Sequence, residues 1–278
     1  MRLGISYALS YESAEIWADL HRKCDCRTVV FPLDCHSDEK TIEAYAKAAC
    51  EADLTIAEVG VWRNMLSSDP KVSQEVFDYT VGQIRMADAI GARCVVNVAG
   101  APHGDRWDGG YRENFTEEAR KQTVETIQKI IDTAKPKKTK FSIEPMPWMI
   151  PTGPEDYLRL IEEVDREGFG VHLDIVNMIN CPERYFFSDE FLEHTFELLH
   201  GRILSCHMKD TQLLPDYTFQ LRECAPGQGT LNLELYAKLA TREDPDMPMI
   251  IEHLHTAEEY YESLAYVQKR LGVQLKLE

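Results

Sequence analysis

The sequence lacks the long hydrophobic run that a membrane-spanning helix needs. None of its apolar stretches approaches the roughly 18 residues that are required to cross a bilayer. The chain passes from Met1 directly into a strand-like segment, without the basic and apolar regions of a signal peptide. We therefore expect a cytoplasmic protein with no membrane partner.

Positive charge is also scarce. The chain has 30 Lys and Arg against 47 Asp and Glu, which gives a net charge of −17. Nucleic-acid-binding proteins draw much of their affinity from basic side chains on phosphates, so this balance disfavours nucleic acid as a partner. It agrees with an enzyme that acts on a small molecule.

Cysteine pairs with the spacing of a redox motif or a zinc site are missing. The eight cysteines are scattered, and Cys24 and Cys26 are separated by one residue instead of two. We expect reduced, structural thiols. The chain also has no Pro-rich or Gly-rich linker and no change in composition along its length, so a single domain over residues 1–278 is expected.

Short β-branched runs alternate with longer segments of helical period along the whole chain. Eight strands are predicted, at Arg2–Tyr7, Arg27–Phe31, Leu54–Gly60, Cys94–Ala99, Lys140–Pro145, Gly170–Ile175, Ile203–Met208 and Met249–His253. Eight helices are predicted, at Tyr11–Lys23, Asp38–Ala52, Val72–Ile90, Thr116–Ala134, Gly153–Val164, Ser188–Leu199, Asn232–Ala240 and Thr256–Arg270. This count predicts an α/β fold, a single (β/α)8 TIM barrel. A doubly wound open sheet is the alternative, but no Gly-rich dinucleotide loop follows the first strand.

Two connections are long and polar, Gly100–Asn114 and Lys209–Gly229. Long loops in compact folds are often functional, so both are candidates for a lid or for substrate contacts. Three tryptophans follow predicted strand ends, and aromatic faces stack well on the C–H faces of sugars. We expect at least one of Trp62, Trp107 and Trp148 to line a pocket.

Four consecutive predicted strands end in a residue that can bind a metal ion. These residues are Glu144, Asp174, His207 and Glu252. The C-terminal ends of the strands of a parallel barrel meet at one face, where active sites are built, so the four side chains are predicted to converge. Three neighbouring carboxylates require a counter-charge. The mixture of oxygen and imidazole ligands suits one divalent ion, with Mn²⁺ expected first and Mg²⁺ or Co²⁺ as alternatives.

Several short motifs accompany these four residues, and with them the sequence resembles the xylose isomerase-like TIM barrels over nearly its whole length. This superfamily comprises sugar isomerases, sugar epimerases and related proteins, and the resemblance is to its sugar isomerase/epimerase-like branch. The motifs are Glu58–Gly60 with Trp62, Asn97–Gly100 with Trp107, Glu144–Trp148, His172–Asp174, His207–Asp210, Pro226–Gly229 and Ile251–Leu254.

The resemblance implies roles for the four residues. All of them would bind one divalent ion, and Glu144 and Glu252 would also be the catalytic acid/base pair. This pair would move a proton on or off a carbon next to a carbonyl of a small carbohydrate. Ketose epimerases of the family tend to carry His three positions after the strand-six Asp, and here that position is Asn177. The difference disfavours a simple free-ketose epimerase, although an Asn side chain can bind a hydroxyl.

Six residues are predicted to bind substrate: Glu58, Trp107, Trp148, Asn177, Lys209 and Arg222. Alternatives remain for two of them. Lys209 is either at the edge of the site or in a surface pair with Asp210, and Arg222 is either a clamp for a substrate oxygen or an exposed loop residue.

Three functions remain open. The first is a metal-dependent sugar isomerase or epimerase, and the second is a C-glycoside deglycosidase-type lyase subunit that cleaves a 3-oxo-glycoside together with a small partner subunit. A non-catalytic sugar-binding barrel is less favoured, because binding alone has little use for four metal ligands. A DNA-repair endonuclease of the superfamily is disfavoured by the net charge. The sequence leaves open whether the chain forms a homo-oligomer or binds a small partner.

Overall fold

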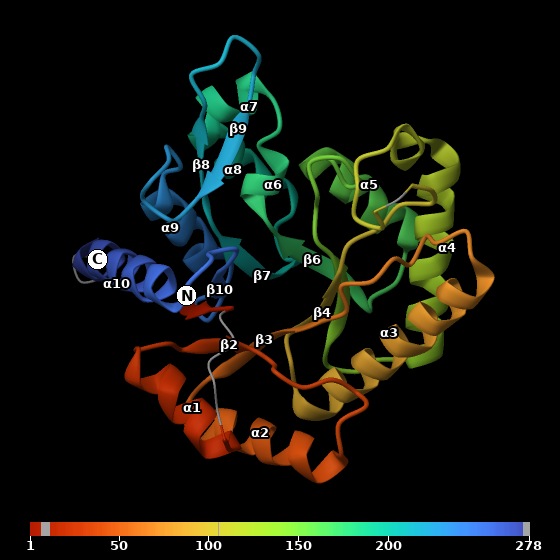
Figure 1. Cartoon of the computed structure of the whole chain (residues 1–278), viewed down its shortest axis with the longest axis horizontal. Helices are drawn as coiled ribbons and strands as arrows, with labels where there is room; N and C mark the ends of the chain where they lie inside the picture. Colours follow the sequence, from red (N-terminus) through yellow and green to blue (C-terminus); the bar gives the residue numbers. More distant parts are fainter. Residues whose placement is uncertain (7–11, 105, 275–278) are drawn as a thin grey trace.

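The computed structural model describes residues 1–6, 12–104 and 106–274. Eight parallel strands form one sheet, in the order β1-β10-β7-β6-β5-β4-β3-β2. The strands from β2 to β7, and then β10, follow one another in the sheet in chain order, and β1 pairs with β10. A helix lies on most of the connections (Figure 1). The strands are β1 (Arg2–Ile5), β2 (Thr28–Val30), β3 (Thr55–Gly60), β4 (Cys94–Asn97), β5 (Lys140–Ile143), β6 (Phe169–Leu173), β7 (Ile203–Met208) and β10 (Pro248–Ile251).

The first two strands nearly close the sheet into a barrel. The backbone N–H of Arg27 donates a hydrogen bond to the carbonyl oxygen of Leu3, at 2.8 Å. Gly4 permits this close approach, because a Cβ at that position would lie 2.1 Å from the carbonyl oxygen of Thr28. The predicted (β/α)8 TIM barrel is thus confirmed.

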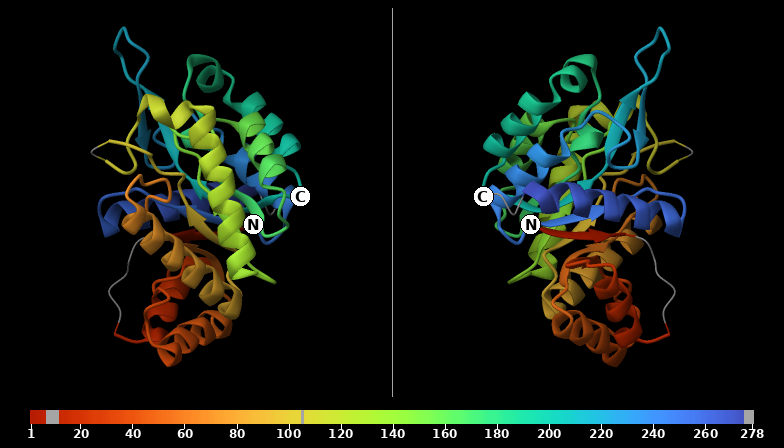
Figure 2. Two further views of the ribbon diagram at one scale, coloured as in Figure 1. Left: turned by 90° about the vertical axis from the view of Figure 1, so that its right-hand side faces the viewer. Right: turned by 90° about the vertical axis from the view of Figure 1, so that its left-hand side faces the viewer.

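The longer helices surround the sheet (Figure 2). They are α1 (Ala14–Lys23), α2 (Glu39–Glu51), α3 (Pro70–Ile90), α4 (Glu117–Ala134), α5 (Pro154–Val164), α8 (Ser188–Leu198), α9 (Leu233–Glu243) and α10 (Ala257–Gln274). All eight lie where a helix is predicted. Helix α3 begins two residues before the predicted start, because the Asp69 side chain accepts a hydrogen bond from the N–H of Lys71 and Pro70 occupies the first turn. None of the helices in the described part of the chain is long and apolar enough to cross a membrane.

Two buried tyrosines connect the helices to the strands that carry the predicted site. Tyr157 of α5 donates to the carbonyl oxygens of Ile143 and Gly170, at 2.5 and 3.2 Å. Tyr236 of α9 donates to the carbonyl oxygens of His207 and Leu173, at 2.9 and 3.3 Å. The C-terminal halves of β5, β6 and β7 are therefore fixed in place by hydrogen bonds as well as by apolar packing.

The structure differs from the prediction mainly in the connections. The predicted loop Lys209–Gly229 contains an antiparallel hairpin, β8 (Asp210–Leu213) and β9 (Leu221–Cys224), which projects beyond the helices (Figure 2). Short helices α6 (Ile175–Met178) and α7 (Pro182–Phe186) follow β6, and the 3₁₀ helix η1 (Arg112–Phe115) lies at the end of the other long connection. Tyr7 and Tyr11, at the predicted ends of the first strand and the first helix, lie outside the described residues.

Candidate metal centre

The four predicted metal ligands lie at the C-terminal ends of four neighbouring strands. Glu144, Asp174 and Glu252 directly follow β5, β6 and β10, and His207 is the penultimate residue of β7. All four are buried, and Glu252 is the most exposed at 8%. One ligand atom from each lies within 4.8 Å of those of the other three. The convergence that the sequence predicts is present in the structure.

The imidazole of His207 lies among the three carboxylates. Its Nδ1 is 2.8 Å from Glu252 Oε1, 3.3 Å from Glu144 Oε1 and 3.7 Å from Asp174 Oδ2. The three carboxylates repel one another at such short distances. His207 is one of two basic side chains that compensate their negative charge. The carboxylates, led by Glu252, outweigh burial and raise the pKa of His207 well above its ordinary value.

Lys209 is the second compensating charge, and its side chain is fully buried. Its Nζ lies 2.6 Å from Asp174 Oδ2 and 2.7 Å from Glu252 Oε1. On its other side it meets Glu223 Oε2 of β9 at 3.4 Å and His253 Nδ1 at 3.1 Å. The structure therefore places Lys209 inside the cluster, among two of the predicted ligands, and not in a surface pair.

The carboxyl groups of the cluster differ in their pKa values. Burial raises the pKa of Glu144 to about 7. Burial acts in the same direction on Asp174 and Glu252, but His207 and Lys209 outweigh it and hold both pKa values well below the ordinary range. Glu144 is thus the carboxyl that most readily carries a proton near neutral pH, whereas Glu252 is ionised.

The donor set fits a divalent metal ion. Asp174 Oδ2 and Glu252 Oε1 are buried, and the groups that face them are cationic side chains: Lys209 Nζ lies 2.6 and 2.7 Å from them, and His207 Nδ1 lies 3.7 and 2.8 Å away. Carboxylate oxygens that already face positive charge in a buried site are suited to a metal ion. Three carboxylates with one imidazole are suitable ligands for Mn²⁺, Mg²⁺ or Co²⁺.

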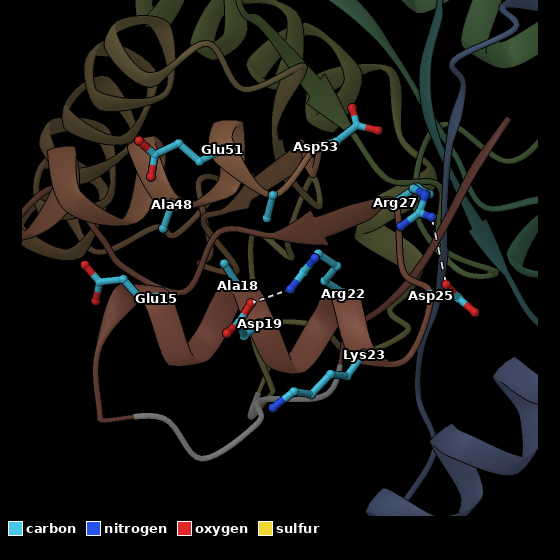
Figure 3. A pocket seen from close by; sticks show the side chains of 11 residues that line it. Glu15, Ala18, Asp19, Arg22, Lys23, Asp25, Arg27, Ala48, Glu51 and Asp53 are labelled. Atoms are coloured by element: carbon cyan, nitrogen blue, oxygen red, sulfur yellow. Dashed lines mark hydrogen bonds and ion pairs between the residues drawn. The ribbon is translucent and has the colours of Figure 1, made fainter.

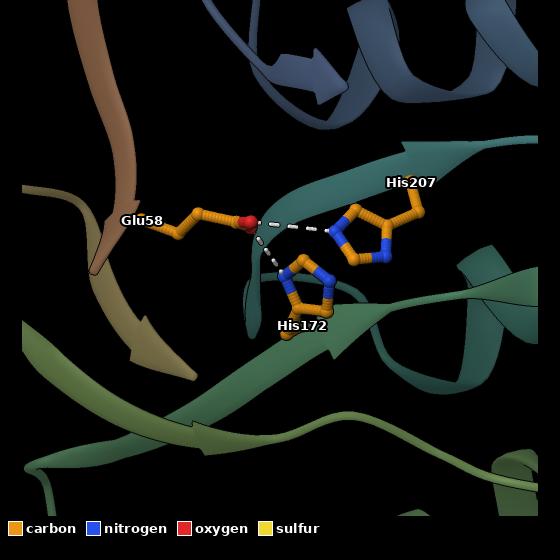
Figure 4. Close-up of side chains that lie close together, drawn as sticks. All are labelled: Glu58, His172 and His207. Atoms are coloured by element: carbon orange, nitrogen blue, oxygen red, sulfur yellow. Dashed lines mark hydrogen bonds and ion pairs between the residues drawn. The ribbon is translucent and has the colours of Figure 1, made fainter. Parts of the chain in front are cut away.

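A second polar group lies in the barrel interior next to this cluster. Glu58 of β3 directs its carboxylate at His172 of β6 and His207 of β7 (Figure 4). Glu58 Oε2 is 3.3 Å from His172 Nδ1, and Glu58 Oε1 is 3.4 Å from His207 Nε2. Burial would raise the pKa of Glu58, but the two histidines outweigh it and lower that pKa. Glu58, predicted to bind substrate, is only 2% exposed and faces two histidines.

One predicted substrate contact, Asn177, lies beside Glu144. Asn177, in the short helix α6, donates from Nδ2 to Glu144 Oε1 at 3.1 Å. Its backbone N–H donates to Asp174 Oδ1 at 3.0 Å, so the side chain of a predicted ligand caps the helix that carries Asn177. Trp148 is 38% exposed and follows Glu144 in the chain.

The two remaining predicted substrate contacts, Trp107 and Arg222, lie in the two long connections. Trp148 Nε1 donates to the carbonyl oxygen of Asp108 at 2.7 Å, which places the segment that carries Trp107 next to Trp148. Trp107 is 38% exposed. Arg222 is exposed on β9, whereas its neighbour Glu223 reaches Lys209.

Asp210, directly after Lys209, has a structural role that the sequence does not reveal. Its buried carboxylate accepts hydrogen bonds from four backbone N–H groups, those of Thr211, Gly227, Gly229 and Leu231, at 2.8 to 3.0 Å. Gly229 is required here, because a Cβ would lie 2.2 Å from Asp210 Oδ1. The motif Pro226–Gly229 is therefore the part of the loop that wraps around Asp210 and fixes the base of the hairpin beside Lys209.

A wide surface groove lies away from the cluster, between α1 and α2 (Figure 3). Charged side chains line it and pair with one another, Arg22 with Asp19 at 3.2 Å and Arg27 with Asp25 at 3.8 Å. None of the predicted site residues is among its lining residues. The candidate site is therefore the strand-end cluster and not this groove.

Comparisons with known proteins agree with the fold. A sequence profile described as xylose isomerase-like TIM barrel matches residues 8–270. The chain belongs to the xylose isomerase-like TIM barrel family. No curated protein matches the sequence of this family member.

Solved structures with 13–17% sequence identity share its fold. A xylose isomerase-like TIM barrel protein from Mycobacterium smegmatis, in complex with magnesium, is 17% identical with a TM-score of 0.69, covering 94% of this chain and 89% of that one. D-psicose 3-epimerase from Clostridium cellulolyticum H10, with D-tagatose, is 13% identical with a TM-score of 0.71, covering 98% and 99%. A 3-keto-D-glucoside 4-epimerase from E. coli is 15% identical with a TM-score of 0.68, covering 97% and 99%.

Proposed function

We propose that this protein is a metal-dependent sugar isomerase or epimerase that moves a proton at a carbon next to a carbonyl. The observation that carries the proposal is the convergence of Glu144, Asp174, His207 and Glu252 within 4.8 Å at the C-terminal face of the barrel. Two of the similar structures are sugar epimerases and a third contains magnesium, which supports the same class of chemistry. We also propose that residues 1–278 form a single domain.

The four converging residues would hold one divalent ion, Mn²⁺ in the first place and Mg²⁺ or Co²⁺ otherwise. Bound there, the ion would polarise the substrate oxygens on and beside the carbon that loses its proton. Every other part of the chemistry falls to the side chains of this chain.

Glu144 and Glu252 are the proposed acid/base pair: one carboxylate takes the proton from carbon and the other returns a proton. Without a metal ion, His207 and Lys209 hold the pKa of Glu252 well below the ordinary range, and burial raises the pKa of Glu144 to about 7. Return of a proton to the opposite face of the same carbon inverts that centre, and return to the neighbouring carbon moves the carbonyl.

Five side chains around the cluster are the proposed substrate contacts. Asn177 and Lys209 already contact predicted ligands, so a sugar hydroxyl bound at the centre would lie close to them. Trp107 and Trp148 supply aromatic surface at the neighbouring loop, and Arg222 on the hairpin supplies a cation. Together they suit a polar, hydroxylated substrate of small size.

Metal analysis and isotope exchange test this proposal. The purified protein should contain about one equivalent of a divalent metal, measured by elemental analysis. With Mn²⁺ restored, it should exchange deuterium from solvent into the carbon next to the carbonyl of one member of a panel of ketoses, inosose-like ketones and 3-oxo-glycosides, followed by NMR.

The two readouts separate the parts of the proposal. A protein that neither contains nor binds Mn²⁺, Mg²⁺ or Co²⁺ contradicts the metal centre. Metal binding with cleavage of a 3-oxo-glycoside would replace the isomerase or epimerase assignment by a lyase.

A further inference from the structure

The proposed chemistry leaves one buried polar group without a role. Glu58, His172 and Ser205, from β3, β6 and β7, are all 2% exposed or less. A carboxylate in a barrel interior loses the solvation of water, so it stays ionised only where other groups compensate its charge. The compensating group here is the ring of a predicted metal ligand.

The two ring nitrogens of His207 face two different sets of carboxylates. Nδ1 faces Glu252, Glu144 and Asp174, and Nε2 lies 3.4 Å from Glu58 Oε1 (Figure 4). A neutral imidazole binds a metal through one nitrogen and carries its proton on the other. The group that accepts this proton decides which nitrogen remains free and how the ring is oriented.

The second oxygen of Glu58 faces His172 without a hydrogen bond of good geometry among the described residues. This oxygen, Oε2, is 3.3 Å from His172 Nδ1, and the same nitrogen lies 2.7 Å from Ser205 Oγ. The His172 and His207 rings are in edge contact, with centroids 4.1 Å apart and planes at 76°. The carboxylate thus lies between two rings, with its hydrogen bond on the side of His207.

We propose that Glu58 is the positioning residue of the metal centre: it accepts the Nε2 proton of His207 and so presents Nδ1 to the ion. His172, which is hydrogen-bonded to Ser205, lies against the other oxygen of Glu58. This inference rests on the proposed metal centre, and it assigns to Glu58 a contact with a ligand in place of the predicted contact with substrate.

Two substitutions at Glu58 test the role. Glu58→Leu removes the acceptor and should weaken Mn²⁺ binding about 10- to 100-fold, measured by calorimetric titration. Glu58→Gln keeps an oxygen that can accept the Nε2 proton, so its affinity should lie between those of Glu58→Leu and the wild type. Partial rescue by the conservative variant is what an acceptor role requires and a purely structural role does not.

A spectroscopic readout and a matched control complete the design. In Co²⁺-loaded protein, the Nε2 proton of a bound imidazole gives a strongly shifted, exchangeable NMR signal. This signal should move in Glu58→Gln and exchange faster with solvent in Glu58→Leu. The control is Asp88→Asn, because Asp88 binds three backbone N–H groups before β5, at the opposite end of the barrel. It should lower stability with no change in the affinity or the NMR signal.

Each remaining outcome has a separate meaning. Unchanged affinity and an unchanged signal in both Glu58 variants would overturn the positioning role alone. Absence of Mn²⁺ binding by the wild type would contradict the proposed metal centre and this inference with it. Two bound ions in the wild type and one in Glu58→Gln would show that Glu58, His172 and His207 hold an ion of their own, which also overturns the positioning role.

Discussion

The two ends of the barrel carry the same kinds of charged side chain in different surroundings. At the N-terminal ends of the strands, Arg2 pairs with Asp53 at 2.9 Å and with Asp246 at 3.0 Å, and the two aspartates are 73% and 68% exposed. At the C-terminal ends, Lys209 pairs with Asp174 and Glu252 at similar distances, with every partner buried. Distance alone does not distinguish the two ends, but burial does.

The difference matters because water screens the first set and not the second. An exposed ion pair contributes about 1 kcal/mol or less to stability. A buried charge that loses its partner is destabilised by several kcal/mol, so the buried carboxylates depend on the cationic side chains beside them. The C-terminal end should therefore respond to single substitutions in function, and the N-terminal end should respond weakly or not at all.

The largest expected effect comes from Glu252. Glu252→Gln keeps an oxygen ligand but removes the proton acceptor, so turnover should fall about 10²- to 10⁴-fold while much of the metal stays bound. His207→Ala should instead lose metal first and activity as a consequence, with partial recovery in excess Mn²⁺. Turnover, deuterium exchange and metal content are measured together in both variants.

The matched control lies at the other end of the barrel. Asp53→Asn removes a carboxylate charge from a pair with Arg2 and should leave turnover and metal content unchanged. If Glu252→Gln retains wild-type exchange with metal in place, Glu252 is at most a ligand. Equal losses in Asp53→Asn would remove the distinction between the two ends.

Two aspartates that bind loops give the second test of the comparison. Asp210, at the C-terminal end, is 1% exposed and accepts four backbone N–H groups. Asp88, near the N-terminal end of β5, is partly exposed and accepts three. Water can replace Asp88 but not Asp210, so Asp210→Ala should cost at least about 3 kcal/mol and Asp88→Ala about 1 kcal/mol.

Chemical denaturation of both variants measures these costs. Asp210→Ala should also lower activity, because Asp210 fixes the base of the hairpin directly after Lys209. Asp88→Ala should keep full activity in the fraction that remains folded. Similar costs for the two variants would mean that burial of the acceptor is not what separates them.

The sequence predicts the part of the site that depends on strand topology. A parallel barrel brings the C-terminal ends of its strands together whatever their sequence, so a metal-binding residue at the end of each of four strands is sufficient to predict convergence. The eight predicted helices coincide with helices of the structure because their hydrophobic period is visible in the sequence. The convergence of the strand ends follows from chain order, which is visible in the sequence as well.

The sequence does not predict contacts that cross the barrel or depend on a hairpin register. Glu58 meets His207 although β3 and β7 are not neighbours in the sheet. Glu223 reaches Lys209 because Thr211 pairs with Glu223 in a hairpin whose residues are too polar to indicate strands. One signal for Glu58 was available: a carboxylate in the middle of the apolar run Leu54–Gly60 needs a buried partner.

The smallest effect concerns His21, a buried ionisable group near the N-terminal end of β2. It lies in the last turn of α1, 3% exposed, and its Nδ1 has no hydrogen-bond partner among the described residues. Burial lowers its pKa from 6.5 to about 4. Unlike His207 and Lys209 at the C-terminal end, it faces no opposite charge among the described residues, so it is buried in the neutral form.

The sign of the pH dependence follows from this lowered pKa. Between pH 6.5 and about 4 the unfolded chain binds a proton at His21 that the folded chain does not, so the free energy of unfolding falls as the pH falls through this range. His21 should account for a loss of about 2–3 kcal/mol at pH 4.5 relative to pH 7. His172, whose pKa is also lowered to about 4 by burial, should contribute a loss of the same sign.

His21→Phe tests this assignment. Phe keeps an aromatic ring against Trp17, whose ring centroid is 5.5 Å from that of His21, and it does not titrate. The variant should be at least as stable as the wild type at pH 4.5 and should lose less stability between pH 7 and pH 4.5, measured by urea denaturation at both values. A wild-type pH dependence in His21→Phe would show that the acid sensitivity comes from the other end of the barrel, where His172 lies beside the candidate metal centre.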